Sequence, residues 1–278
     1  MTGRPVVVGV DGSPGAARAV AWATVEAARR RRPLQVLAVL PAHGVSSVFL
    51  ASDAAEEARR AVPELVVSAD VRRGDPVEAL LDAGRDAELL VVGSRGRGTI
   101  GSLVLGTVSA AVAARATCPT VVVRGTRVPS PDDPVVVGID GTPSGEAAVG
   151  YAFAAADREG VPLVAVHVWQ DLQDPEWGSM LDDDVSPSAA EGMPDLPEAE
   201  LLGERLAGWS SKFPDVEVLR VLPEGRPVPT LVARSDDARL VVVGSHRRQG
   251  LERVLGSVGQ SVLRRAQCPV AVVPPPAS

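Results

Sequence analysis

The sequence has few aromatic residues, two cysteines and no apolar run long enough to cross a bilayer. Aromatic residues make up 3% of its 278 residues, so the core must be built from Val, Leu and Ala. Cys118 and Cys268 do not make a disulfide framework, and we expect both to be buried as small apolar groups. A transmembrane helix needs ~20 apolar residues, and a strand-like run follows the N-terminus directly. We therefore expect a cytoplasmic protein with no signal peptide and no membrane contact.

Positive charge is also in deficit, with 28 Lys and Arg against 35 Asp and Glu and a net charge of −7. This balance argues against a nucleic-acid partner. The acidity is local, because Asp171–Glu200 contains ten acids and no basic residue. Two interpretations of this segment stay open: a solvated loop, or a lid or partner-docking segment anchored by Trp169 and Trp177.

An internal repeat organises the chain. "PVVVGVDGSP" at Pro5–Pro14 recurs as "PVVVGIDGTP" at Pro134–Pro143, an offset of 129 residues. "ATCPTVVV" from Ala116 recurs as "AQCPVAVV" from Ala266, an offset of 150 residues. Two copies of one unit therefore stand in tandem, and the second copy contains an insertion.

The repeat predicts two domains, 1–125 and 134–278, with the acidic insertion at about 171–200 in the second. The stretch between them, "GTRVPSPDDP", is rich in Pro and Asp and is typical of a linker.

Apolar β-branched runs alternate with Ala-rich helical stretches within each copy. Such runs are typical of strands buried on both faces of a parallel sheet. Ser13 and Pro14 are suited to begin the first helix. The alternation predicts a doubly wound α/β domain. The predicted strands are Val6–Val10, Leu34–Leu40, Val66–Val71, Leu89–Val92 and Thr120–Val123; the predicted helices are Ala16–Arg31, Asp53–Val62, Pro76–Gly84 and Val108–Ala116.

The stretch "VVGSRGRGTIGSLVLGTV", Val91–Val108, is the strongest candidate for an anion-binding loop. A Walker A loop requires a Lys after its last glycine, and none is present. "GRGTIG" matches G-x-G-x-x-G, but it follows the fourth strand rather than the first, and the next acid downstream is Asp132. Both of these phosphate signatures are therefore excluded.

A wider spacing fits better: Gly93, two residues, Gly96, nine residues, then Gly106 and Thr107. The first two glycines let the backbone approach a phosphate with no Cβ in the way. The last pair opens the helix Val108–Ala116, whose N-terminal amides attract an anion.

Arg95 and Arg97 add positive charge to this loop within an acidic protein. The alternative is a flexible surface turn with no ligand. A matching loop that begins at Gly244 in the second copy argues against that alternative.

These motifs resemble those of the universal stress proteins of the ATP-binding type, here in tandem. The resemblance covers nearly the whole chain and depends on the G-x2-G-x9-G-[ST] spacing and on Asp11 at the end of the first strand. It implies a five-stranded parallel sheet of order 3-2-1-4-5, flanked by helices, in each copy. That order places the first and fourth strands side by side, at the point where ligands bind in open α/β sheets.

The resemblance also implies the residues of a first nucleotide site. Asp11 is expected to meet the ribose or a Mg²⁺ ion carried by the phosphates, and Val39 to contact adenine. The alternative for Asp11 is a helix-capping acid in a turn. The expected site comprises Gly9, Asp11, Val39, Val92, Gly93, Ser94, Arg95, Gly96, Arg97, Gly98, Gly106, Thr107 and Ser109.

The second copy departs from the motif. Arg247 stands where the second glycine belongs, and Gly244–Gly256 is one residue shorter than Gly93–Gly106. We expect the first site to be the better one. Two interpretations of the second stay open: ATP binds with altered contacts, or Arg247 itself neutralises phosphate charge. Its expected residues are Gly138, Asp140, Val168, Gly244, Ser245, His246, Gly256 and Ser257.

The function expected from these features is a nucleotide-dependent binding module in a stress response, with ATP and its Mg²⁺ as cofactors. The alternatives are a slow ATP-hydrolysing enzyme and a nucleotide-free interaction scaffold. No catalytic residue is assigned. The fifth strands are apolar edges that need cover, so we expect either an internal pseudo-dimer or a homodimer. The sequence does not identify a protein partner.

Overall fold

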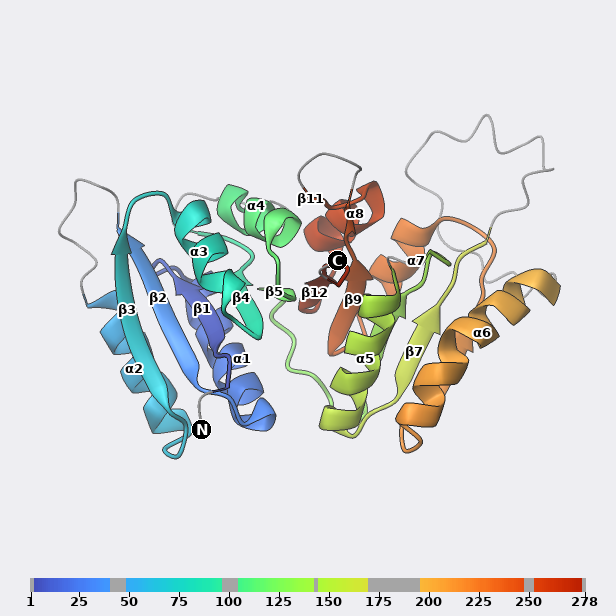
Figure 1. Ribbon diagram of the computed structural model, residues 1–278, viewed down its shortest axis with the longest axis horizontal. Helices are drawn as coiled ribbons and strands as arrows, with labels where there is room; N and C mark the ends of the chain where they lie inside the picture. Colours follow the sequence, from blue (N-terminus) through green and yellow to red (C-terminus); the bar gives the residue numbers. More distant parts are fainter. Residues whose placement is uncertain are drawn as a thin grey trace.

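The computed structural model describes residues 3–40, 49–96, 105–142, 145–169, 196–247 and 253–276. The first half lies on one side of the molecule and the second half on the other, with both fifth strands at the centre (Figure 1). The first half contains β1 (Val6–Val10), α1 (Pro14–Arg30), β2 (Leu34–Leu40), α2 (Leu50–Ala61), β3 (Val67–Arg73), α3 (Pro76–Arg85), β4 (Leu89–Gly93), α4 (Thr107–Arg115) and β5 (Thr120–Val123). The second contains β6 (Val135–Gly138), α5 (Glu146–Glu159), β7 (Leu163–Val166), α6 (Leu196–Lys212), β8 (Val218–Val221), α7 (Pro227–Arg234), β9 (Leu240–Gly244), β10 (His246–Arg247), β11 (Arg253–Val254), α8 (Ser257–Arg265) and β12 (Val270–Val273).

The two halves share one ten-stranded sheet of order β3-β2-β1-β4-β5-β12-β9-β6-β7-β8. Within each half the strands are parallel and follow the expected order 3-2-1-4-5. At the centre β5 pairs antiparallel with β12, and Val122 lies opposite Val270. The expected internal pseudo-dimer is therefore present in the chain. Strands β10 and β11 form a separate antiparallel pair.

The predicted elements of the first half are confirmed, with β1, β2 and β5 at the predicted bounds. The predicted cap of the first helix is also confirmed, because the Ser13 hydroxyl accepts a hydrogen bond from Ala16 N at 3.1 Å and Pro14 is the first helical residue. The expectation that every strand is buried on both faces is wrong for the run that begins at Val66. Strand β3 lies at the outer edge of the sheet, where four of its seven residues are exposed.

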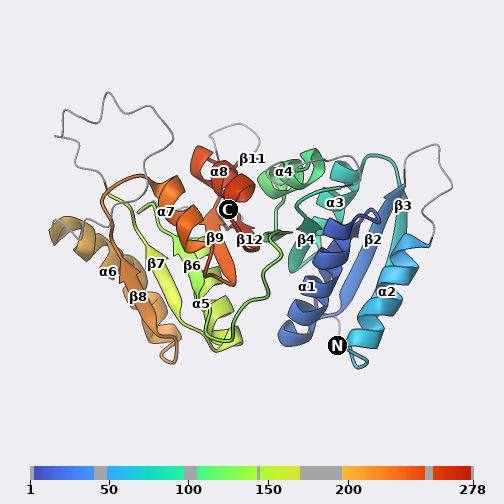
Figure 2. The same cartoon turned by 180° about the vertical axis from the view of Figure 1, so that it is seen from behind.

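Helices cover both faces of the sheet and form two apolar cores that run across both halves. Helices α1, α2, α5 and α6 cover one face, and α3, α4, α7 and α8 the other (Figures 1 and 2). In the first half the helix positions of the first core are mostly Ala, including Ala51, Ala55 and Ala58 of α2. Small side chains let a helix approach the sheet closely, so this core needs little aromatic volume. None of the helices within the described ranges is both long and apolar enough to span a bilayer.

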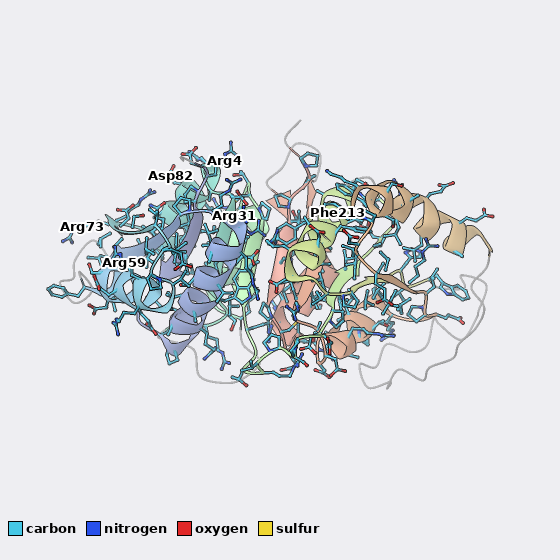
Figure 3. The ribbon with its side chains drawn as sticks, turned by 90° about the horizontal axis from the view of Figure 1, so that it is seen from below. Arg4, Arg31, Arg59, Arg73, Asp82 and Phe213 are labelled. Atoms are coloured by element: carbon cyan, nitrogen blue, oxygen red, sulfur yellow. The ribbon has the colours of Figure 1, made fainter. Side chains whose placement is uncertain are left out.

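The second half uses aromatic rings where the first uses alanine. Phe153 on α5, Trp209 on α6 and Phe213 stack with ring centroids 6.0–6.4 Å apart. In the view from below, Phe213 lies beside α5 and α6 (Figure 3). A Cβ on Gly150 would lie 2.3 Å from the Trp209 ring, so the glycine makes room for the indole. Much of the small aromatic content of the chain is therefore concentrated in one core.

Charged side chains join α1 to α5 at the junction of the two halves. We call them the junction cluster: Glu26, Arg29 and Arg30 of α1, Arg158 and Glu159 of α5, and Arg239 just before β9. Glu26 is 4% exposed, and its Oε1 atom lies 2.6 Å from Arg30 Nε and 3.0 Å from Arg158 Nη2. Glu159 pairs with Arg29 and Arg239. Because a buried charge is costly unless it is paired, the cluster fixes the two halves relative to each other.

The linker is held on the second half from its first residues. Gly125 has φ +73°, and a Cβ there would lie 1.8 Å from the Gln267 carbonyl oxygen, so only glycine fits. Further along, Arg239 Nη2 donates to the carbonyl oxygens of Ser130 at 2.9 Å and Pro131 at 2.7 Å. Close contact between the linker and the second half therefore begins directly after β5.

Candidate functional site

The first candidate site is a cavity at the carboxyl ends of β1 and β4. The strand order reverses between these two strands, which is the usual ligand position in an open α/β sheet. The cavity has a volume of about 500 Å³, within the range of small-molecule sites. It is lined by Gly9, Val10, Asp11, Ala16, Leu37, Val39, Pro76, Leu80, Val92, Gly93, Arg95, Gly96, Leu105, Gly106, Thr107, Val108 and Ser109.

Glycines let the backbones around this cavity approach closely. A Cβ on Gly93 would lie 2.6 Å from the backbone of Gly15, and one on Gly15 would lie 2.5 Å from the Arg95 carbonyl oxygen. Both distances are too short for a side chain. The start of α1 is therefore pressed against the end of β4, and the loop after β4 is held over the ends of the strands.

Asp11 forms the turn after β1 and also lines the cavity. Its Oδ1 atom accepts a hydrogen bond from Ser13 N at 2.9 Å, which stabilises the turn into α1. Its Oδ2 atom faces Gly96, where a Cβ would lie 2.7 Å away. The carboxylate also lines the cavity. Asp11 is thus a turn-forming acid that keeps one oxygen on the cavity side, next to the second glycine of the motif.

The N-terminus of α4 forms another wall of the cavity. Gly106 is its N-cap and has no side chain to satisfy the first N–H groups of the helix. The Gly106 N–H donates to the Ser94 carbonyl oxygen at 2.9 Å, and the Ser109 hydroxyl donates to the Gly93 carbonyl oxygen at 2.6 Å. These bonds hold the helix end, the positive pole of its dipole, against the loop after β4.

The structure brings most of the expected first-site residues together. Ser94 is 4% exposed and supports the loop through its backbone rather than lining the cavity. Arg97 and Gly98 lie outside the described residues. The expected residues that line the cavity are Gly9, Asp11, Val39, Val92, Gly93, Arg95, Gly96, Gly106, Thr107 and Ser109.

Sequence reasoning found Val39 and Val92 but missed the rest of the apolar wall. Leu37 lies two residues before Val39 on β2, so the alternation of a strand puts both on one face, and this signal was available. Pro76 and Leu80 come from the start of α3 and carry no motif. A Cβ on Gly9 would lie 2.9 Å from Leu80, so glycine at this position lets α3 close the cavity.

A second, smaller cavity of about 340 Å³ lies at the corresponding place in the second half. Ser245 is 2% exposed and, like Ser94, does not line its cavity. His246 and Arg247 form β10, which pairs with β11. The expected residues that line the second cavity are Gly138, Asp140, Val168, Gly244, Gly256 and Ser257.

Two substitutions change the surroundings of the second cavity, and a third lies in the motif. Gly259 replaces Ser109, and the space it leaves is filled by Leu255, which is 2% exposed and does not line the cavity. Its counterpart Leu105 lines the first cavity. His167, where the first half has Ala38, lines the second cavity, and its Nδ1 lies 2.9 Å from the Ile139 carbonyl oxygen. The third change is Arg247, already visible in the sequence.

The acidic segment is described only at its ends. Trp169, an expected anchor, donates from Nε1 to the Leu222 carbonyl oxygen at 3.2 Å and pairs with Glu224 in an isolated bridge. Residues 170–195, including Trp177, lie outside the described residues. Both interpretations of the segment remain predictions.

Comparison with known proteins gives one consistent result. The model of the universal stress protein family matches residues 3–124 and 133–274. A universal stress protein of Mycobacterium tuberculosis is 40% identical over 292 residues, covering 96% of each chain. One from Mycolicibacterium smegmatis is 36% identical over 294 residues, covering 97% of each chain. Among solved structures, a universal stress protein of Archaeoglobus fulgidus has a TM-score of 0.69 at 20% identity and covers 97% of this chain and 98% of its own, a likeness of fold.

Proposed function

The chain belongs to the universal stress protein family, and from this premise we propose that its first half binds ATP, carried with Mg²⁺, as a nucleotide-dependent module of a stress response. The second half takes ATP more weakly or with altered contacts. Binding, rather than turnover, is the activity of the protein. Slow ATP hydrolysis and a nucleotide-free scaffold are the alternatives that the experiment below must exclude.

The observation that carries the proposal is the polarity of the first cavity. One end is apolar and formed by Leu37, Val39 and Leu80, which suits a flat base. The other end is formed by glycines, Arg95 and the uncapped N-terminus of α4, which suit phosphates. Asp11 lies between the two ends, beside Gly96. A nucleotide has the same order of groups: base, ribose, phosphates.

Magnesium fits this site as an ion that arrives with the phosphates. Asp11 is the only acid among the residues that line the described cavity, and a single carboxylate with phosphate oxygens is a common way to hold Mg²⁺. Within the described ranges, no group of three His, Cys, Asp or Glu side chains is placed to hold a metal. Asp11 would hold the ion together with the nucleotide, and the ion would neutralise phosphate charge.

The remaining parts of the proposal concern partners and location. The pairing of β5 with β12 covers both fifth strands within one chain, so the fold does not require a homodimer to protect these edges. We keep a homodimer through other surfaces, and a cytoplasmic location, as proposals. Light scattering of the purified chain measures its oligomeric state and so tests for the homodimer.

The test combines identification of the nucleotide with a change of charge. Nucleotide released from the denatured, purified protein is identified by mass spectrometry, and Mg·ATP binding is measured by calorimetry. Asp11→Asn keeps the oxygen that accepts from Ser13 N but removes the charge. We expect Mg·ATP binding to weaken about tenfold, and metal-free ATP binding not to weaken, because a repulsive charge is lost. Asp82→Asn, on the outer surface of the first half (Figure 3), is the matched control.

Each alternative has its own outcome. A wild-type protein that releases no adenine nucleotide and binds no added ATP is a scaffold, and the proposal is then wrong. Release of inorganic phosphate above background that Asp11→Asn abolishes supports the enzyme instead.

A further inference from the structure

Arg124 is a half-buried cation directly after β5, where the chain leaves the first half. Its Nη1 atom donates a hydrogen bond to the Leu263 carbonyl oxygen of α8, in the other half. Its Nε atom is buried and has no hydrogen-bond partner. The next residue, Gly125, is pressed against Gln267. Arg124 therefore stands at a tight contact with part of its hydrogen-bonding capacity unused.

Arg124 differs in its pairing from the arginines of the junction cluster. Arg30 and Arg158 pair with Glu26, and Arg239 pairs with Glu159. Within the described ranges, no ion pair includes Arg124. Burial lowers the pKa of Arg124 from its usual value; Cys268 acts in the opposite direction, and the positive charge of Arg95 lowers the pKa further. A half-buried cation beside another cation, with no carboxylate of its own, is a place where an anion is stabilising.

The strand register connects this cation to the first cavity. Gly93 of β4 lies opposite Val123 of β5, and Ser94 N donates to the Val123 carbonyl oxygen at 2.9 Å. Arg124 therefore comes opposite Ser94, and Arg95, which lines the cavity, is one residue further along its strand. The carbonyl oxygen of Ser94 in turn holds Gly106 at the start of α4. Arg124 thus extends the positive charge at the Arg95 end of the cavity towards α8 of the second half.

The second half has no counterpart. The repeat places Pro274 of "VAVVP" at the position of Arg124 in "TVVVR". Proline carries neither charge nor a donor, so the charge arrangement is specific to the first site.

We propose that Arg124 is a specificity-determining residue of the first site that selects nucleotides by the number of their phosphates. The inference rests on the proposed function, because the anion it requires is the polyphosphate of a nucleotide in the first cavity. Each added phosphate brings negative charge between or near Arg95 and Arg124 and relieves the repulsion between them. Salt screens charges only beyond about 8–10 Å, so direct contact with the terminal phosphate is not required. The triphosphate is bound in preference to the monophosphate.

The test is the ratio of the dissociation constants for AMP and ATP, measured by calorimetry in the absence of Mg²⁺. In Arg124→Gln we expect this ratio to fall about five- to tenfold, while AMP affinity changes less than about twofold. The matched control is Arg127→Gln, three residues further along, whose partners are Asp133 and the Ala238 carbonyl oxygen; its ratio should equal that of the wild type. Arg124→Lys keeps the charge and should keep most of the preference.

The outcomes separate this inference from the proposed function. Equal loss of ATP and AMP affinity in Arg124→Gln means that Arg124 only supports the fold, and an unchanged ratio means that its charge is not sensed. Either result overturns the inference while nucleotide binding stands. If the wild type binds neither nucleotide, both proposals are wrong. If Arg124→Gln unfolds, the wild type and Arg124→Lys still decide the question. A preference that depends on charge grows when the salt concentration is lowered. If both proteins prefer ATP over AMP less at low salt than at high salt, the inference is overturned.

Discussion

The two halves of this protein share a fold but differ at their sites. Their strand orders agree, and the turn after the first strand is built in the same way: Asp11 accepts from Ser13 N, and Asp140 accepts from Thr142 N. Their cavities measure about 500 and 340 Å³. The differences that we identify lie after the second strand, in the sequence that follows the fourth strand, and in the first turn of α4 and α8. Buried Val and Ala strands therefore preserve the fold, whereas a few residues beyond the strands decide what each half can hold.

The largest expected effect comes from weakening the contact between the two halves. Glu26→Gln removes the buried acid shared by Arg30 and Arg158; Arg30 keeps Glu88, whereas Arg158 loses this partner across the junction. Breaking a buried pair in this way costs about 3–5 kcal/mol, and we expect the free energy of unfolding, measured with urea, to fall by about this amount. The matched control is Glu56→Gln, an exposed acid paired with Arg59, with an expected change of ~0.5 kcal/mol or less. Equal changes in both variants would show that the junction cluster does not hold the halves together.

The next prediction tests whether the first half dominates nucleotide binding. Asp140→Asn makes in the second half the change that Asp11→Asn makes in the first, and Thr142 N and Oγ1 can still donate to the remaining oxygen. We expect it to weaken the tighter Mg·ATP binding event less than about twofold, against about tenfold for Asp11→Asn. Calorimetry of both variants measures the comparison. If the two losses are similar, the halves are equivalent sites.

An exchange of side chains should make the second cavity resemble the first. In Gly259→Ser the new Cβ would lie 2.5 Å from Leu255 Cδ1, so Leu255 must turn out of its buried position towards the cavity, where Leu105 already lies in the first half. We expect a loss of about 1–3 kcal/mol of stability from overpacking, measured by thermal unfolding. The reverse change, Ser109→Gly, removes the hydroxyl that donates to Gly93 O and should cost about 1 kcal/mol. If the stability of neither variant changes, the residue at positions 109 and 259 does not determine where Leu105 and Leu255 lie.

The smallest expected difference concerns the cysteines, which occupy matching positions before β5 and β12. Both are buried, and burial raises the pKa of the Cys268 thiol to about 12. Because the thiolate is the reactive form, neither should react with iodoacetamide near neutral pH in the folded protein, and both should react in denaturant. Mass spectrometry counts the adducts. Rapid labelling of one cysteine in the native state would indicate a reactive thiol and would contradict the interpretation of both as small apolar groups.

The sequence predicted the strands and the glycines around the first cavity, because apolar runs and the glycine spacing are strong local signals. Strand β3 shows the limit of hydrophobic counting, since Ser68 and Asp70 alternate with apolar residues and indicate an exposed edge. The sheet order came from the resemblance, because periodicity does not encode which strands become neighbours. Leu80 reaches the site from α3 by tertiary packing, and Arg124 gains its setting from α8. Neither has a local motif.

The pairing of β5 with β12 has a consequence for synthesis of the chain. Strand β5 is complete when less than half of the protein has been made, but its partner β12 is the last strand. At about 5–20 residues per second, the apolar edge "TVVV" waits roughly 10–30 s for its partner. During that interval a nascent first half presents an open β-edge to other nascent copies on the same messenger RNA. The short length of β5 limits the surface available for such mispairing.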